Sequence, residues 1–459
     1  MSRRIPWPLA LLVAVTLLLP LLAACGGSSE STATTAAETS TTSSGASQTA
    51  TTAPSGSPAA SPAGSGSSST PTASGEALKI GMLAPFTGDL SDFGPAFWNA
   101  AMLAVEEINS AGGVLGQPVE LVRADDGTSP QQGVEEARRL VEVERVSAII
   151  GAAASGVTLP IAESVTGPSG IVQISPASTS PALTDANDND FLFRTTISDA
   201  AQGVVLAQLA QEQGFKTACT MYTNNAYGQG LSEVFSREFE RLGGKVLAQV
   251  PHEQEQASYA SELATCTEGN PDVLAAISYP ESARVYLREA VEQGLVKNFL
   301  FVDGTKSEEQ FADLGWDVFQ GMWGTAPGAL DTDEGKSFDA RYEQAYGRRP
   351  ELPFLRESYD AVYVIALAAQ KAGSTDPTAI RDAIREIANP PGETVTPGPD
   401  GWARALELIA AGTDINYEGA ASPADFDDHG DVLKGAIEVW RVQGNAIVVQ
   451  ETREIDLSQ

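Results

Sequence analysis

Short apolar runs alternate with helix-like stretches along the chain from residue 78 onward. The runs 78–86, 118–126 and 146–154 are rich in β-branched and other apolar residues and have the length of strands. Between them, 93–113 and 131–144 carry apolar residues at the spacing of one helix face. Regular alternation of strand and helix with short connections predicts an α/β fold, in which helices cover both faces of a parallel sheet.

The same alternation begins again near residue 199. Helical stretches there are separated by apolar runs at 216–224, 245–253, 272–280 and 298–304. Two similar units in series predict two lobes. In open sheets of this kind a ligand binds at the carboxyl ends of the strands, so the residues that follow each run are the candidates for a binding site.

Polar and aromatic side chains follow these strands. In the first unit the third strand leads to Ser155, and the fourth leads into ISPASTSPALTD at 174–185, which places five hydroxyls around two prolines. In the second unit Tyr227, Tyr279 and Asp303 stand close behind strand ends. The first lobe therefore offers small hydrogen-bonding groups, and the second offers aromatic rings and an acid.

The N-terminus has the pattern of an export signal. Arg3 and Arg4 precede an apolar stretch that ends in small residues before Cys25, and that ending resembles a bacterial lipoprotein signal. A permanent transmembrane helix is the alternative, which three prolines within the stretch disfavour. We expect residues 1–24 to be a lipoprotein signal peptide and Cys25 to carry the lipid that anchors the protein to the outer face of a bacterial membrane.

A low-complexity segment separates this anchor from the folded part. Residues 25–76 are mostly Ser, Thr, Ala, Gly and Pro, with almost no large apolar side chain. Such a segment buries too little surface to offset the entropy lost on ordering. We therefore expect a disordered linker there.

The charge of the chain narrows its partners. With 60 acidic and 28 basic residues, the formal net charge is −32. A nucleic-acid backbone requires a basic face, so this balance argues against nucleic acid as a partner. It also disfavours adsorption of the protein surface to anionic lipid, which leaves the lipid anchor as the expected link to the membrane.

Apart from Cys25, the chain has two cysteines, Cys219 and Cys266. In an exported protein such a pair is a candidate disulfide. The sequence does not show that the two lie close together, so two buried free thiols remain the alternative at this point.

The sequence offers little support for catalysis or metal binding. Its two histidines, His252 and His429, lie in stretches that we expect to be surface loops, whereas a Ser-His-Asp triad would need one of them in the cleft. The acidic runs 185–190 and 425–431 lack the spacing of an EF-hand loop. Zinc-ligand spacing and a phosphate-binding glycine loop are also missing. We expect no enzyme, no cofactor and no metal site.

The ordered set of motifs resembles the branched-chain amino-acid (Leu/Ile/Val) type of periplasmic binding protein, the lipoprotein solute-binding subunit of ABC importers. The resemblance covers nearly all of the chain from Leu78 to about Val449. It rests on IGMLAPFTGDLSDFG, AVEEINSAGGVLGQPVELVRADDGTSPQQGVEEARRLVEVERVSAIIG, ISPASTSPALTD, NNAYGQGL, VDGT, SYDAVYVIALAAQKAG and INYEGAASPADFDDHGDV.

The resemblance implies a type I fold of two doubly wound α/β lobes joined by three crossover segments and closing on a solute. Lobe 1 would comprise residues 77–198 and about 328–430. Lobe 2 would comprise about 199–327 and the C-terminal hairpin within 431–459.

The resemblance also implies how a ligand is held. The family binds a ligand carboxylate through a serine after the third strand, matched by Ser155, and through an alanine and a threonine of the SPAxT turn, matched by Ala177 and Thr179. Such neutral donors make charge-assisted hydrogen bonds to a carboxylate. The alternative is that these small residues beside prolines only form the turn.

In the second lobe the family holds the ligand ammonium with an acid, which Asp303 matches, although glutamate is frequent there. Tyr227 and Tyr279 match aromatic wall positions, and Phe93 stands where the family often has tyrosine. Each has a structural alternative. Asp303 could cap a turn or helix, the Tyr279 ring could point into the sheet, and Phe93 could belong to the core.

Together these features predict an extracytoplasmic solute-binding protein that captures a small amino acid, branched-chain in the family's usual case. We expect a monomer that works with an ABC permease and its ATPases. Two alternatives stay open. The closed protein could signal to a receptor instead, or the ligand could be an amide, urea or an aromatic acid.

Overall fold

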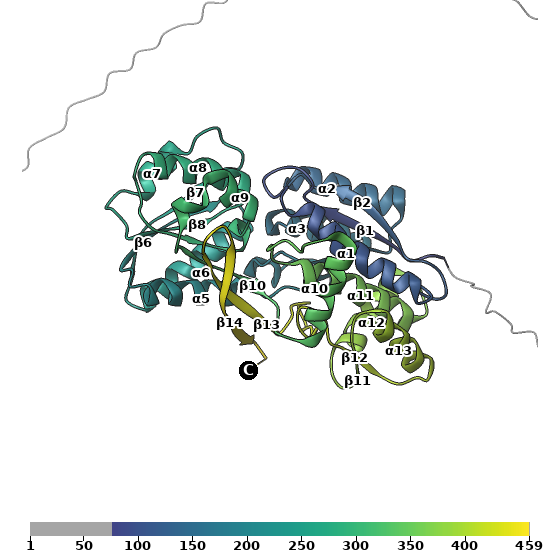
Figure 1. Ribbon diagram of the computed structural model, residues 1–459. Helices are drawn as coiled ribbons and strands as arrows, with labels where there is room; N and C mark the ends of the chain where they lie inside the picture. The colour runs from purple at the N-terminus through teal and green to yellow at the C-terminus, as the bar shows by residue number, and fades with distance from the viewer. Residues whose placement is uncertain (1–75, 459) are drawn as a thin grey trace, which may run out of the picture. The chain divides into compact units, whose positions relative to one another are not determined.

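The computed structural model describes residues 76–458 (Figure 1). The expected signal peptide, Cys25 and nearly all of the expected linker lie outside the described residues. Within the described range, no helix combines the length and the apolar character that crossing a membrane requires.

The first sheet is fully parallel and has five strands in the order β2-β1-β3-β4-β5. The order reverses around β1, and the crevice at such a switch point is where open α/β sheets bind ligands. The strands are β1 (Lys79–Ala84), β2 (Glu120–Asp125), β3 (Ala148–Ile150), β4 (Val172–Ser175) and β5 (Leu192–Arg194).

Helices from two distant parts of the chain cover this sheet. The early ones are α1 (Gly94–Ser110), α2 (Pro130–Arg139), α3 (Ser155–Ile161) and α4 (Gly167–Ser169), with π-helical turns at Leu140–Glu144 and Ala162–Thr166. The later ones are α10 (Asp333–Tyr346), α11 (Leu355–Ala372), α12 (Pro377–Ala388) and α13 (Pro399–Ala410), with a small parallel sheet of β11 (Glu393–Val395) and β12 (Ile415–Tyr417).

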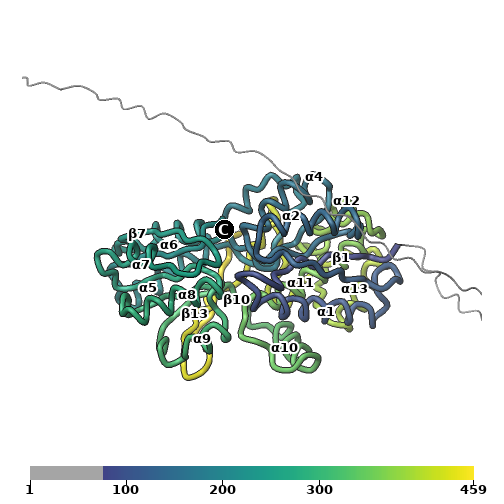
Figure 2. Tube along the Cα trace, turned by 90° about the horizontal axis from the view of Figure 1, so that it is seen from above, coloured from purple at the N-terminus to yellow at the C-terminus, as the bar shows by residue number. Residues whose placement is uncertain are grey.

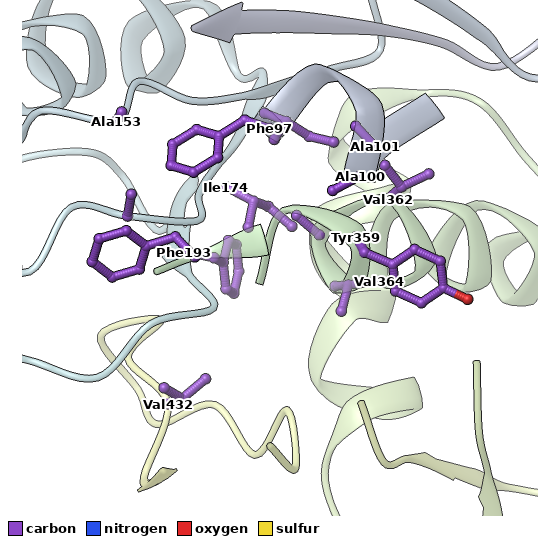
Figure 3. Packing of buried hydrophobic residues seen from close by; sticks show 14 of the residues in the cluster. Phe97, Ala100, Ala101, Ala153, Ile174, Phe193, Tyr359, Val362, Val364 and Val432 are labelled. Atoms are coloured by element: carbon purple, nitrogen blue, oxygen red, sulfur yellow. The ribbon is translucent and has the colours of Figure 1, made fainter. Parts of the chain in front are cut away.

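The core of this lobe forms where α1 and α11 meet the sheet. Helix α11 packs against α1, α12 and strands β3 and β4, so it is apolar on nearly every side. Figure 3 shows Phe97 of α1, Ile174 of β4 and Val362 of α11 within one cluster of buried side chains. A helix that is apolar on all sides is typical of the core, where neighbouring elements pack against each of its faces.

The second sheet has seven strands in the order β14-β13-β10-β9-β8-β6-β7. The strands are β6 (Thr217–Thr223), β7 (Lys245–His252), β8 (Val273–Ile277), β9 (Phe299–Phe301), β10 (Trp323–Gly328), β13 (Lys434–Val442) and β14 (Ile447–Asp456). The last two form a C-terminal hairpin that joins this sheet antiparallel to β10, and Figure 2 shows β13 beside β10.

The second lobe is covered by helices from one continuous part of the chain. They are α5 (Asp199–Glu212), α6 (Ala226–Arg241), α7 (Ala260–Cys266), α8 (Pro280–Glu292) and α9 (Glu308–Leu314), with 3-10 turns at Asp303–Thr305 and Trp316–Phe319. The chain passes between the two sheets three times, at 195–198, at 329–332 and in the segment that leads to β13.

The two cysteines are joined. The Sγ atoms of Cys219 and Cys266 lie 1.91 Å apart in a disulfide that links β6 to the end of α7. Of the two alternatives that the sequence left open, the structure therefore has the disulfide.

One expectation about the histidines is wrong. His252 is not in a surface loop but is 2% exposed. It is the last residue of β7, and its ring packs against Tyr259 and Tyr286 while Nε2 lies 3.0 Å from Ser278 Oγ. The sequence Pro-His-Glu is typical of a polar loop, but the alternation of side chains along the strand turns the imidazole inward. His429 is exposed, as expected.

The two acidic runs serve the fold. In the first, Asp188 accepts the backbone N–H of Leu192, and Asp190 pairs with Arg385. In the second, Asp425 pairs with Lys434. Among residues 76–458 there is no group of three His, Cys, Asp or Glu side chains arranged to hold a metal ion.

Candidate functional site

A narrow cavity lies between residues of the two lobes, at the carboxyl ends of their strands. Six of the seven predicted ligand-binding residues line it, and Thr179 does not. The full lining is Leu90, Phe93, Phe97, Ala153, Ser155, Ala177, Tyr227, Tyr279, Asp303, Gly304 and Phe354.

The turn of the first lobe is held by its own hydroxyls. Ser175 Oγ donates to the carbonyl oxygen of Ala152 at 2.7 Å and accepts the N–H of Ser178 at 3.0 Å. Ser178 Oγ lies 2.8 Å from Thr158 Oγ1, and Ser180 Oγ donates to the carbonyl of Ala226 at 2.7 Å. Most hydroxyls of this stretch therefore preorganise the turn, and Ala177 is the residue of the stretch that lines the cavity.

Ser155 joins this turn to helix α3. It is the first residue of α3, and its Oγ accepts the N–H of Ser180 at 3.2 Å. The Ser155 hydroxyl proton is thus directed away from that N–H and is available to an acceptor such as a carboxylate.

Asp303 faces the cavity from the second lobe. Its Oδ1 accepts hydrogen bonds from Tyr227 Oη and from Gln202 Nε2, each at 2.8 Å. Burial raises the pKa of Asp303 to about 6. Burial also holds the pKa of Tyr227 well above its usual value, so the Tyr227 hydroxyl stays protonated and donates. A cation beside Asp303 would favour its charged form.

Asp199 is a second acid that the sequence did not single out. It is fully buried, and its Oδ2 accepts the Thr179 hydroxyl at 2.8 Å, while Oδ1 has no hydrogen-bond partner among the described residues. Burial, followed by the charge of Asp303, raises the pKa of Asp199 well above its usual value. The Thr179 hydroxyl thus donates to Asp199, and Thr179 does not line the cavity.

The two predicted tyrosines form one wall. The rings of Tyr227 and Tyr279 are stacked, with centroids 5.4 Å apart and an interplanar angle of 10°. Asn225 Nδ2 donates to the Tyr279 hydroxyl at 3.1 Å, and this bond fixes the Tyr279 ring. Tyr279 precedes α8 and Tyr227 lies in the first turn of α6, so both rings are carried by helix N-termini at strand ends.

Phenylalanine rings close the apolar end. Phe93 meets Phe97 edge to face with centroids 5.8 Å apart, and Phe97 meets Phe354 in the same way at 6.4 Å. Phe97 follows Phe93 by one helical turn, a spacing that could have identified it from the sequence. Phe354 has a left-handed backbone, with φ of 71°, and lies far along the chain, so no local signal points to it.

The lobes also contact each other beside the cavity. The N–H of Ser282 donates to Asp89 Oδ1 at 2.7 Å, and the Ser282 hydroxyl donates to Asp89 Oδ2 at 2.8 Å. Arg284 pairs with Asp92 at 2.7 Å. The loop that supplies Leu90 and Phe93 to the cavity therefore binds the first turns of α8 in the other lobe.

This arrangement suits binding. None of the residues that line the cavity in the described structure is a histidine, cysteine, lysine or arginine. Ser155 Oγ accepts a backbone N–H. Nucleophilic catalysis by a serine requires a general base beside its hydroxyl, and the described lining offers no histidine or lysine for that role. The cavity instead presents neutral donors on one side, the acid Asp303 on another, and mostly aromatic rings around the rest.

Comparison with known proteins agrees with this geometry. Residues 77–403 match the family described as Periplasmic binding protein. The leucine-, isoleucine-, valine-, threonine- and alanine-binding protein of Pseudomonas aeruginosa is 28% identical over 68% of this chain and 82% of its own length. The chemotactic substrate-binding protein BasB of Halobacterium salinarum is 27% identical over 77% of this chain and 84% of its own length.

Solved structures show the same fold. The leucine-binding protein LivK of Thermotoga maritima superimposes with a TM-score of 0.69 at 26% identity, over 82% of this chain and 98% of that one. The predicted type I fold is confirmed. The family consists of binding proteins rather than enzymes, and its members work outside the cytoplasm. This chain belongs to the periplasmic binding protein family, as a solute-binding protein of two α/β lobes.

Proposed function

We propose that this protein binds a small α-amino acid with an aliphatic side chain, of the branched-chain class, and delivers it to an ABC importer. The observation that carries the proposal is the cavity lining, which combines a hydroxyl and a tight backbone turn, a buried acid and an apolar ring of phenylalanines. In a zwitterion with an aliphatic side chain, the carboxylate matches the hydroxyl and the turn, the ammonium matches the acid, and the side chain matches the phenylalanines.

The lining of the cavity supports an apolar side chain on the ligand. Leu90, Phe93, Phe97 and Phe354 leave only apolar surface at one end. A polar side chain there would lose its water without gaining a hydrogen bond, which is costly.

The acids support an ammonium group. Asp303 is 4% exposed, and one oxygen of the neighbouring buried Asp199 has no hydrogen-bond partner among residues 76–458. Burial, followed by the charge of Asp303, raises the pKa of Asp199 well above its usual value. A cation bound beside Asp303 would favour the ionised form of Asp303.

The importer role rests on the family and on the N-terminus. The P. aeruginosa relative and LivK carry names of amino-acid-binding proteins. In this proposal residues 1–24 direct export, Cys25 holds the lipid, and residues 25–76 tether the lobes near a permease with its ATPases. Closure of the lobes by hinge motion would present the loaded form.

The test is a binding screen on the chain from residue 26 onward. Thermal unfolding is measured with leucine, isoleucine, valine, small amides, urea and benzoate. A ligand present at a hundred times its Kd stabilises by about 2.7 kcal/mol. A raised melting temperature with leucine, isoleucine or valine supports the proposal. A rise only with compounds that lack the amine or the carboxylate contradicts it.

A sensing role is the second candidate, because BasB, at 27% identity, is named for chemotactic signal transduction. Deleting the gene separates the two roles. Loss of uptake of radiolabelled ligand supports the importer. Unchanged uptake, with loss of a ligand-dependent behavioural or transcriptional response, supports the sensor.

A further inference from the structure

Arg194 is a buried cation directly behind the turn of the first lobe. It is the last residue of β5 and is 1% exposed. Its Nη1 donates to the carbonyl oxygens of Ser180 at 2.8 Å and of Ser178 at 3.4 Å, and its Nη2 donates to Thr184 Oγ1 at 3.0 Å. The guanidinium therefore holds the turn without itself lining the cavity.

These bonds fix the peptide unit between Ser178 and Thr179. The Ser178 carbonyl and the Thr179 N–H belong to that same unit. A guanidinium on the oxygen of a peptide fixes its orientation and polarises the N–H at its other end. Arginine does this with a rigid planar fork, which lysine lacks. None of the described residues that line the cavity is a cation, so Arg194 is a positive charge that acts on this turn through the backbone.

A carboxylate from a distant segment completes the group. Asp431 Oδ1 accepts Arg194 Nε at 2.5 Å, and Asp431 Oδ2 accepts Nη2 at 2.7 Å. Thr184 donates to the same carboxylate at 2.6 Å. The N–H of Arg194 also donates to the Gly430 carbonyl at 3.0 Å. The two segments are thus bound by both backbone and side chains.

The position of this pair links the turn to the crossovers. Arg194 directly precedes the crossover at 195–198, and Asp431 lies three residues before β13, where the chain returns to the second lobe. The N–H of Asp199, at the far end of the first crossover, donates to the Thr179 carbonyl at 2.8 Å. The turn is therefore bonded to two of the three segments that must bend when the lobes move.

We infer that Arg194 is a positioning residue for the ligand-binding turn 175–180, with Asp431 as its counter-ion, and that the pair joins this turn to the hinge. Its effect on affinity rests on the proposed function. Its effect on the turn does not, because the bonds exist without a ligand.

The first measurement is hydrogen exchange by mass spectrometry on the unliganded chain from residue 26 onward, comparing wild type with Arg194→Lys and Asp431→Asn. We expect amides of the peptide 175–184 to exchange at least tenfold faster in both variants, with peptides of β6 and α6 unchanged. Arg341→Lys is the matched control, because Arg341 pairs with Glu107 in the first lobe at 2.7 Å. It should leave 175–184 unchanged.

Unchanged exchange at 175–184 in Arg194→Lys would overturn the inference. An increase spread evenly over the first lobe would do so as well, since that is the signature of a general loss of stability. Both outcomes are measured on the unliganded chain, so they do not depend on whether an amino acid binds.

The second measurement is calorimetric titration with L-leucine. We expect the Kd of Arg194→Lys and Asp431→Asn to rise at least tenfold, and that of Arg341→Lys to stay within twofold of wild type. A wild-type chain that does not bind leucine contradicts the proposed ligand, and the exchange result then decides on Arg194. Wild-type affinity in Arg194→Lys, together with faster exchange at 175–184, would contradict a role in ligand positioning.

Discussion

At the scale of single residues, the site divides its work between charge and shape. Asp303 is the acid that faces the cavity. Asp199 accepts the Thr179 hydroxyl, and its other oxygen has no partner in the described part of the chain. Tyr227 donates to Asp303 and stacks on Tyr279, so the same ring orients the acid and forms the wall. Loss of Asp303 should therefore affect recognition of the amine more than the fold.

We predict that Asp303→Ala weakens binding of the amino-acid ligand at least 100-fold, because removing one partner of a buried ion pair costs about 3 kcal/mol or more. Calorimetric titration measures the effect. Asp331→Ala is the control, because its side chain is 84% exposed and pairs with surface Lys336. An Asp303→Ala affinity within twofold of wild type would exclude the ammonium role.

The pKa of Asp303 gives a pH dependence. Burial raises it to about 6 in the absence of ligand, and a bound ammonium favours the ionised form. Ligand binding should therefore release a proton when the pH is below about 6 and should weaken as the pH falls, by up to tenfold per unit. Titrations between pH 7 and pH 4.5 test this. Asp303→Asn should show a flatter profile, and an equally steep profile in that variant would assign the proton to another group.

At the scale of elements, the disulfide ties β6 to α7 in the second lobe. The two cysteines are separated by 47 positions, and closing a loop of that size in the unfolded chain stabilises the fold by about 4 kcal/mol in the chain-entropy treatment. Both sulfurs are fully buried in the second hydrophobic cluster, away from the cavity lining.

We predict that the double variant Cys219→Ala, Cys266→Ala unfolds at a lower temperature than wild type and binds the ligand with unchanged affinity. Denaturant titration measures the loss of stability. Adding reductant to wild type should reproduce it. If reductant changes nothing while the double variant is destabilised, the loss comes from packing and the disulfide is not formed in solution.

At the scale of the whole molecule, the lobes are joined by side chains of the loop that also lines the cavity. Helix α8 begins after Tyr279, which makes no side-chain cap. Asp89 of the other lobe supplies that cap instead, by accepting the Ser282 N–H and hydroxyl. Because these bonds join residues of both lobes, the proposed hinge motion would break them when the lobes separate.

We predict that Asp89→Ala speeds ligand dissociation more than it slows association. The variant leaves buried donors at α8 unpaired in the closed form, which costs roughly 1–3 kcal/mol, and it leaves the ligand contacts intact. Stopped-flow fluorescence separates the two rates. Ser91→Ala, in the same loop, is the control and should match wild type. A change confined to the association rate would contradict a role in holding the closed form.

Much of the fold and part of the site were predictable from local pattern. Strand runs at 78–86 and 146–154 became β1 and β3, and the residues that follow strands face the cavity. The prediction for His252 was wrong because a polar tripeptide at a strand end is typical of a loop. The packing of Tyr259 and Tyr286 shows that the His252 ring is enclosed.

The sequence by itself determined the alternation of strands and helices, the acidic surface and the order of motifs, because these depend on local periodicity and composition. The tertiary structure decided which groups meet. Thr179 bonds Asp199 instead of lining the cavity, and Phe354 joins Phe97 across more than half of the folded chain. Arg194 reaches Asp431 in the same way. Such contacts depend on how distant segments pack, and no periodicity in the chain records that.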